Sequence, residues 1–172
     1  IVNHGLILKD TYFYNNKKII VYNQTNEGSA GGWYKIIEYF TELNFDYMWL
    51  MDDDGFPDIH ALYNLVNIKN LKFSCVSSIV INENYKNKFV FPMPKLNKNN
   101  LPSIINFKRK HKNLKSILRI SKNNLYPYAH LFNGALFSSH IISIVGNVNK
   151  NYFMYGDELD YFYRLKKIAP VY

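Results

Sequence analysis

Cysteine is almost missing from the sequence, since Cys75 is the only one among 172 residues. A single cysteine excludes a disulfide within these residues and suits a reducing compartment. Cys75 lies in the apolar stretch FSCVSSIVI, so we expect a buried, unreactive thiol rather than a nucleophile. The sequence also lacks an apolar run that could span a bilayer, and it shows no signal peptide. We therefore expect a cytoplasmic location, with peripheral attachment to the inner membrane face left open.

Acidic residues are absent from the middle of the chain. All 13 Asp and Glu residues lie at or before Glu83, or at or after Asp157. Twelve Lys and Arg residues lie between those two positions, so the net charge of +8 is unevenly placed. A basic segment of this kind can bind nucleic acid, anionic lipid headgroups or a phosphorylated ligand. Charge alone does not decide between these partners.

Apolar residues are plentiful by contrast, at 48% of the sequence, which suffices for a packed core and excludes a disordered chain. Apolar strands alternate with helical patterns, which predicts an α/β fold with a mostly parallel central sheet flanked by helices. The predicted strands lie in residues 1–7, 17–24, 46–51, 73–81 and 130–138. The predicted helices are 32–43, 57–68 with Pro57 in its first turn, a short helix within 138–146 with Ser138 or Ser139 as N-cap and Gly146 as its stop, and 156–168.

The predicted organisation is one domain over residues 1–172 with three parts. Residues 1–83 hold the alternating strands and helices, and residues 129–172 return to the same core. Residues 84–128 form a basic excursion rich in Asn and Lys, with one short amphipathic helix around 108–120. Because a strand begins at residue 1, we expect the fold to be incomplete at that end.

The stretch YMWLMDDDGF places Asp52, Asp53 and Asp54 directly after a buried strand. Carboxylates packed together repel one another, so such a cluster calls for a cation or for a solvated turn. In an extended strand end, Asp52 and Asp54 face one side and can hold Mg²⁺ or Mn²⁺, and Gly55 permits a sharp turn. The alternative is an acidic turn that caps the next helix through Asp54 or Asp58. Ligands of parallel sheets bind at this edge, which favours the metal.

Two further motifs could carry chemistry. The glycine-rich NEGSAGG can offer backbone N–H groups to an anion, but it lacks the spacing of a phosphate-binding loop, and a simple turn explains it equally well. The stretch YGDELDYFYR contains four charged side chains, and a carboxylate there can act as a general base. Helix capping with an Asp160–Arg164 pair is the plainer interpretation of the second motif. The five histidines show no metal-ligand spacing.

Taken in order, the motifs resemble the GT-A glycosyltransferases of family 2, most closely the galactofuranosyltransferase and rhamnosyltransferase-like branch. The matching stretches are NEGSAGGW, YMWLMDDDGFPDIHAL, FNGALFSSHIISIVG and NYFMYGDELDYFYRLKK, which lie in this order within residues 23–168. The resemblance implies a GT-A fold, a nucleotide-diphospho-sugar donor with UDP or dTDP, Mn²⁺ or Mg²⁺, and inversion at the anomeric carbon. It also implies that the fold is incomplete at both ends, because a nucleotide-binding strand usually precedes this region and a metal-ligand histidine usually follows it.

The resemblance further assigns roles near the metal turn. Asp52 and Asp54 correspond to the metal-binding pair, and Asp53 lies nearer the sugar or ribose of the donor. Gly31, Gly32 and Trp33 correspond to a loop over the donor sugar and its phosphates.

At the catalytic helix, Glu158 falls where the family usually has an aspartate that acts as base, so its arm is one methylene longer. Its neighbour Asp157 could share or replace that role. Asp160 falls where a glutamate is usual, and it is followed by Arg164; both are expected to be structural residues near the site.

The resemblance thus implies an inverting, metal-dependent glycosyltransferase that moves galactofuranose, rhamnose or a similar sugar to a hydroxyl of a glycan or lipid-linked glycan in surface polysaccharide synthesis. The basic segment 86–122 fits an anionic membrane surface. A non-catalytic remnant of this fold that binds a glycan or nucleotide is the alternative. Nucleic acid is not expected as a partner, because the sequence contains no helix-turn-helix, RRM signature or zinc site.

Overall fold

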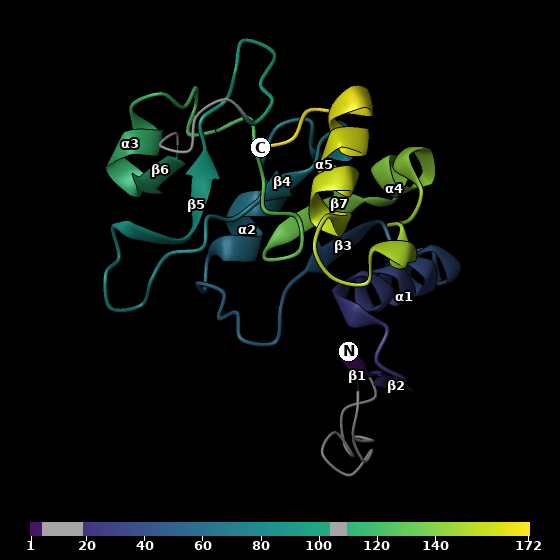
Figure 1. Cartoon of the computed structure of the whole chain (residues 1–172). Helices are drawn as coiled ribbons and strands as arrows, with labels where there is room; N and C mark the ends of the chain where they lie inside the picture. The colour runs from purple at the N-terminus through teal and green to yellow at the C-terminus, as the bar shows by residue number, and fades with distance from the viewer. Residues whose placement is uncertain (5–18, 104–109) are drawn as a thin grey trace.

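The computed structural model describes residues 1–4, 19–103 and 110–172 (Figure 1). In these ranges no helix is both long and apolar enough to cross a bilayer. The strands are β1 (Val2–His4), β2 (Tyr22–Gln24), β3 (Tyr47–Leu50), β4 (Val76–Ser77), β5 (Lys88–Pro94), β6 (Lys110–Asn113) and β7 (Ala135–Ser138). The helices are α1 (Gly28–Leu43), α2 (Ala61–Val66), α3 (Leu114–Leu118), α4 (Ser139–Val145) and α5 (Asp157–Ile168), with 3-10 turns η2 (Leu71–Phe73) and η3 (Lys150–Tyr152).

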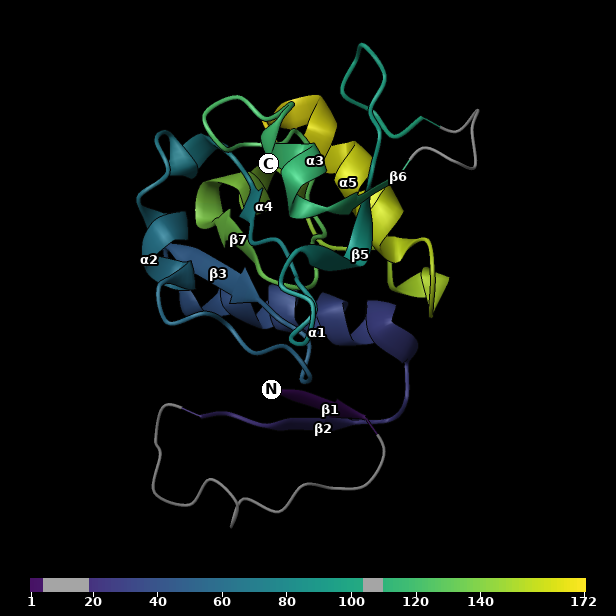
Figure 2. The ribbon, with the colours of Figure 1, turned by 90° about the vertical axis from the view of Figure 1, so that its left-hand side faces the viewer.

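The strands form three small sheets rather than one central parallel sheet, so the predicted topology is wrong in this respect. β1 and β2 pair in parallel beside α1 (Figure 2). β7 lies between β3 and β4 and runs antiparallel to both, and β5 pairs antiparallel with β6. The mixed α/β character is confirmed. An apolar strand sequence indicates that the strand is buried, but it does not indicate whether the strand runs parallel or antiparallel to its neighbours. The sequence therefore did not reveal that β7 is antiparallel to β3 and β4.

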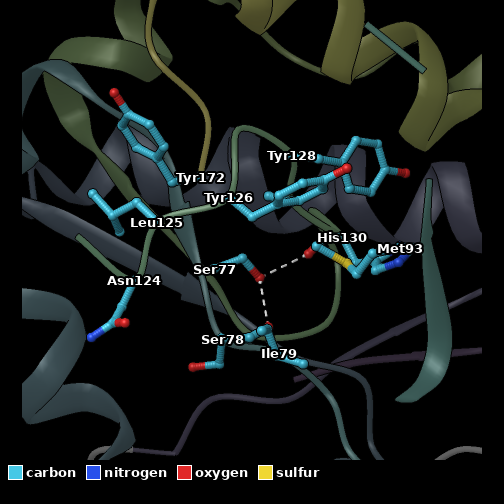
Figure 3. A pocket seen from close by; sticks show the side chains of 11 residues that line it. Ser77, Ser78, Ile79, Met93, Asn124, Leu125, Tyr126, Tyr128, His130 and Tyr172 are labelled. Atoms are coloured by element: carbon cyan, nitrogen blue, oxygen red, sulfur yellow. Dashed lines mark hydrogen bonds between the residues drawn. The ribbon is translucent and has the colours of Figure 1, made fainter. Parts of the chain in front are cut away.

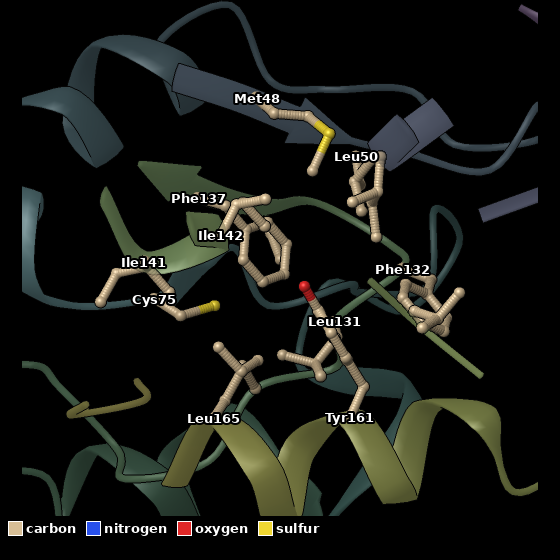
Figure 4. Close-up of a cluster of buried hydrophobic side chains, with 14 of the residues drawn as sticks. Met48, Leu50, Cys75, Leu131, Phe132, Phe137, Ile141, Ile142, Tyr161 and Leu165 are labelled. Carbon is tan, nitrogen blue, oxygen red and sulfur yellow. The ribbon is translucent and has the colours of Figure 1, made fainter. Parts of the chain in front are cut away.

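Strand β7 is buried along its whole length and occupies the centre of the main core. Phe137 of β7 lies against Tyr161 of α5, and Met48 and Leu50 of β3 lie on its other side (Figure 4). Helix α4 adds Ile141 and Ile142 to the same cluster. Burial of large side chains of this kind contributes about 1.5–3 kcal/mol each, so this cluster fixes how α5 sits against the sheet.

Cys75 lies in this core and is fully buried, as the sequence predicts. Burial raises the pKa of its thiol well above the ordinary value. The predicted limits of α4 are also confirmed, because the Ser138 hydroxyl accepts a hydrogen bond from the Ile141 N–H and Gly146 follows the last helical residue.

Other predicted elements differ in extent. Helix α2 begins at Ala61, and Pro57 precedes it, because Asp58 accepts the His60 N–H through its side chain and the Ala61 N–H through its carbonyl. The strand predicted over 73–81 is reduced to β4. Part of the helix predicted around 108–120 lies outside the described residues. The described part contains β6 and then α3, because the Asn113 side chain caps the helix at Ser116 N–H.

Candidate active site

The three consecutive carboxylates lie where β3 ends. Asp53 and Asp54 form a turn that is closed by the Gly55 N–H, which donates to the Asp52 carbonyl at 3.2 Å. The predicted alternation of an extended strand is therefore wrong, because the backbone has already turned at Asp54. Asp52 is half-buried, whereas Asp53 and Asp54 are exposed. A Cβ at Gly55 would lie 3.2 Å from the Asn133 side-chain oxygen, so glycine permits the close approach of that side chain.

Asn133 connects the aspartate turn to the start of β7. Its amide nitrogen donates to an Asp52 carboxylate oxygen at 3.3 Å. The antiparallel pairing explains the contact, because Leu50 at the end of β3 pairs with Ala135 at the start of β7. The Gly134 N–H also donates to the Leu50 carbonyl at 2.8 Å. The reversed strand therefore brings the segment 130–134 to the edge where the aspartates lie.

The charge around Asp52 is negative. Partial burial and the carboxylates of Asp54, Asp53 and Glu158 all raise the pKa of Asp52. Glu158, at the start of α5, therefore lies close enough for its charge to act on this turn. The charges of residues 53–54 and of Glu158, which are distant in the sequence, therefore act on the same carboxyl group.

Glu158 is held by the loop that precedes β7. One of its carboxylate oxygens accepts the Leu131 N–H at 2.6 Å, and the same oxygen lies 3.7 Å from the His130 ring nitrogen Nδ1. The other oxygen has no hydrogen-bond partner among the described residues. The side chain as a whole is 37% exposed. Glu158 thus has one anchored oxygen and one that no described residue binds.

Aromatic rings surround His130. Phe91 of β5 and Tyr128 have ring centroids 5.4 and 5.2 Å from the imidazole. Burial and the Glu158 charge raise the pKa of the Tyr128 hydroxyl, which keeps it neutral. His130 and Tyr128 line a cavity of about 50 Å³, where Ser77 at the end of β4 donates to the His130 carbonyl (Figure 3). This hydrogen bond and the ring contacts of His130 fix the loop that anchors Glu158.

Asp157 has a different environment from its neighbour. It is buried, and its carboxylate accepts the Ser29 hydroxyl at 3.2 Å. Ser29 is in the first turn of α1, where the Ala30 N–H donates to the Phe153 carbonyl. Gly28 has φ +70°, and a Cβ there would lie 2.0 Å from the Phe153 oxygen, so only glycine allows this contact. Asp157 therefore helps to join the starts of α1 and α5.

The glycine-rich loop predicted from NEGSAGG is wrong, because α1 already begins at Gly28. Gly31 and Gly32 consequently lie in the helix, and Gly31 is buried. Trp33 is also buried and stacks on Phe132, with ring centroids 4.7 Å apart and an angle of 17°. Its observed contact supports the segment that carries Asn133. The donor contacts predicted for these three residues remain predictions.

Asp160 and Arg164 form the expected i,i+4 pair. The Arg164 Nε lies 2.9 Å from an Asp160 carboxylate oxygen. The same guanidinium donates to the carbonyls of Val145 and Asn147, both at 2.9 Å. Arg164 thus joins α5 to the end of α4, which is a structural function.

A divalent cation suits the chemistry of the aspartate turn, although the turn is not a complete cage. Across residues 1–4, 19–103 and 110–172, no group of three or more His, Cys, Asp and Glu side chains is placed to hold a metal. Mg²⁺ is commonly bound through one or two carboxylates, with phosphate oxygens and water as further ligands. Asp52 and Asp54 would be those carboxylates. The pKa of Asp52 is raised first by partial burial and then by the neighbouring carboxylates, whose negative charge a cation would neutralise.

The residues that sequence analysis missed are those of the loop before β7. Asn133, His130 and the Leu131 N–H connect the two acidic segments, yet HLFNGALFS was interpreted as a plain strand. The signal was an asparagine followed by glycine inside an apolar run, which indicates a turn.

The fold and the site together define an α/β protein in which the carboxylates of Asp52 and Glu158 bind the same segment, residues 131–133, at one edge of the main sheet. The chain is a distant homologue of the galactofuranosyltransferase GlfT1 of Mycolicibacterium smegmatis, with 30% identity over 146 residues. The match covers 83% of this chain and 46% of that protein, so the chain spans about half the length of its curated relative. No protein-family model matches the sequence. The predicted resemblance to family 2 glycosyltransferases of the galactofuranosyltransferase branch is confirmed at the level of distant homology.

Proposed function

We propose that the chain is the catalytic region of an inverting, metal-dependent glycosyltransferase with a GT-A fold. It transfers galactofuranose, rhamnose or a similar sugar from a nucleotide-diphospho-sugar to a hydroxyl of a glycan or lipid-linked glycan. The observation that carries the proposal is the convergence of Asp52 and Glu158 on the segment 131–133. The distant homology to a galactofuranosyltransferase supports the reaction class. The resemblance of the motifs to family 2 glycosyltransferases suggests a place in surface polysaccharide synthesis.

Glu158 is the proposed general base. Its anchored oxygen fixes the carboxylate, and its second oxygen accepts the proton of the acceptor hydroxyl as that hydroxyl attacks the sugar. Asp157 is buried, and its carboxylate accepts the Ser29 hydroxyl. This difference between the two neighbours supports the choice of Glu158 as the base. The glutamate side chain is one methylene longer than the aspartate that is usual at this position. The Leu131 N–H binds its carboxylate and so holds the longer side chain in place.

Asp52 and Asp54 are the proposed ligands of a divalent ion, Mn²⁺ or Mg²⁺, which when bound neutralises charge on the departing diphosphate. Asn133 orients Asp52 through its amide. Asp54 follows in the turn that the Gly55 N–H closes, and its charge acts on Asp52. Asp53 is exposed on the same turn and can contact the sugar or ribose of the donor. UDP and dTDP donors both remain candidates.

The test measures release of nucleoside diphosphate and glycoside product from UDP-galactofuranose and dTDP-rhamnose, with short glycan acceptors. Glu158→Gln should lower turnover by about a hundredfold or more, because general-base catalysis contributes that much, while donor binding persists. Asp160→Asn is the matched control, since it removes one carboxylate from the same helix. Full turnover in Glu158→Gln would contradict the assignment. Nucleotide binding without product from any donor would favour the binding-only alternative.

A further inference from the structure

The basic excursion folds into a lobe with its own small core. The basic lobe, as defined here, comprises β5, β6, α3 and their described connections, residues 84–103 and 110–126 (Figure 1). Phe89 and Met93 of β5, Ile117 of α3 and Tyr126 are buried together. The Tyr126 hydroxyl donates to the Pro94 carbonyl at 2.6 Å. This core gives the surface of the lobe a fixed shape.

The surface of the basic lobe is positive and uncompensated. It contains no Asp or Glu. Its Lys and Arg side chains are all exposed, and none forms an ion pair with a carboxylate of a described residue. These residues are Lys86, Lys88, Lys95, Lys98, Lys110, Lys112, Lys115, Arg119 and Lys122. A surface of one sign without internal partners attracts an external anion.

Helix α3 and the residues that directly follow it add apolar groups to this positive surface. Ile117 points into the core of the lobe with 1% exposure, whereas Leu118 and Ile120 are 49% and 51% exposed. Lys115 and Arg119 are four residues apart on the helix and thus neighbours. Together with Leu118, they line one surface hollow. Cations and aliphatic side chains therefore meet at one place.

We propose that this part of the basic lobe docks on an anionic lipid bilayer. Lys115 and Arg119 contact headgroup phosphates, and Leu118 and Ile120 enter the boundary between headgroups and acyl chains. A bilayer surface offers both kinds of partner, whereas single-stranded nucleic acid is bound by aromatic stacking, which aliphatic side chains do not provide. Each cation near an anionic surface strengthens binding about fivefold.

The position of the lobe relative to the candidate active site suggests its purpose. Phe91 of β5 contacts the ring of His130, which lies 3.7 Å from the Glu158 carboxylate. The docked lobe would therefore hold the candidate base close to the membrane surface, where a lipid-linked acceptor is found. This link to the acceptor rests on the proposed function, whereas the docking itself does not.

The test is co-sedimentation of the chain with phosphatidylcholine vesicles, prepared with and without phosphatidylglycerol. We expect binding only to the anionic vesicles. In the double variant Lys115→Gln, Arg119→Gln, the partition coefficient should fall about 25-fold, from two losses of about fivefold. The double variant Lys69→Gln, Lys72→Gln is the control, because it removes the same charge from exposed positions outside the lobe.

The apolar contribution needs its own pair of variants. Ile120→Ser should weaken binding about fivefold or more, because it removes an aliphatic side chain from the bilayer boundary. Ile144→Ser on α4 is the control, since Ile144 is 54% exposed and lies outside the lobe. Thermal unfolding shows that each variant is folded.

Three results would overturn the proposal: no binding to anionic vesicles, equal losses in the lobe variants and their controls, or tighter binding to single-stranded RNA that Ile120→Ser leaves unchanged. The last result would identify a polyanion site instead. The co-sedimentation assay does not involve sugar transfer. A negative result in it would not contradict the proposed function, and a negative transfer assay would not contradict the docking.

Discussion

Replacement of Arg164 by methionine tests whether this residue is structural. The substitution keeps the aliphatic stem and removes the guanidinium, which binds Asp160 and the carbonyls of Val145 and Asn147. The Arg164 and Asp160 side chains are 32% and 31% exposed, so the ion pair contributes at most about 1 kcal/mol. The two hydrogen bonds to carbonyls contribute about 1 kcal/mol each, because water partly replaces them.

The expected loss is therefore about 2–3 kcal/mol in the free energy of unfolding, which for a domain of this size lowers Tm by about 5–10 °C. Chemical denaturation followed by circular dichroism measures the free energy directly. Arg164→Lys should recover only part of the loss, because a single ammonium cannot reach three acceptors in the planar geometry of a guanidinium.

Asp160→Asn isolates the ion pair and should cost less than about 1 kcal/mol, with the difference reduced at high salt. If Arg164→Met stays within about 0.5 kcal/mol of the parent protein, the hydrogen bonds to the end of α4 do not stabilise the fold, and our reasoning is wrong.

Three further predictions concern buried groups. In metal-free buffer, Asp52→Asn should raise Tm at pH 7, because the folded state raises the pKa of this carboxyl and so disfavours its charge. The gain should vanish as the pH falls below 3.8, the ordinary pKa of an aspartate, because Asp52 is then protonated in both states; a constant gain in a pH series of melting curves contradicts this. Tyr161→Phe should cost about 1–2 kcal/mol in urea unfolding, because the fully buried hydroxyl donates to the Gly146 carbonyl at 2.9 Å, and a neutral effect refutes that contribution. Cys75 should react with a thiol reagent only on unfolding, since it is buried and its pKa is raised; rapid labelling of the native protein argues against this core.

Local patterns predicted the helices best where capping residues were explicit. Ser138 and Gly146 define α4 as expected, and the acidic first turn of α5 matches its position. The glycines of α1 suggested a loop, but the structure places them in a helix. At least one of them is required by a contact with a distant part of the chain. Gly28 serves a contact with Phe153, which is more than a hundred residues away in the sequence. A pattern within a short window contains no information on such a contact.

The sequence suggested the acidic residues of the candidate site. It did not reveal the loop before β7 that binds them. Asp52 and Glu158 follow from motif and resemblance, but the loop that holds both of them depends on β7 running antiparallel to β3. Strand direction is decided by tertiary packing. The contacts of Asn133 with Asp52 and of His130 with Glu158 are therefore visible only in the structure. The distinction between Asp157 and Glu158 likewise required their contacts, since both side chains have the same chemistry.

The central claim is that the aspartate turn holds a nucleotide-diphosphate through a divalent ion. Calorimetric titration of UDP, first with Mn²⁺ and then with EDTA, tests it most directly, with dTDP titrated in parallel. We expect one of the two nucleotides to bind only with the metal present, to lose binding in Asp54→Asn and to keep it in Asp58→Asn, a control for an exposed carboxylate in the same loop. Equally strong binding in EDTA, or unchanged binding to Asp54→Asn, would show that the aspartate turn does not bind the nucleotide through a metal.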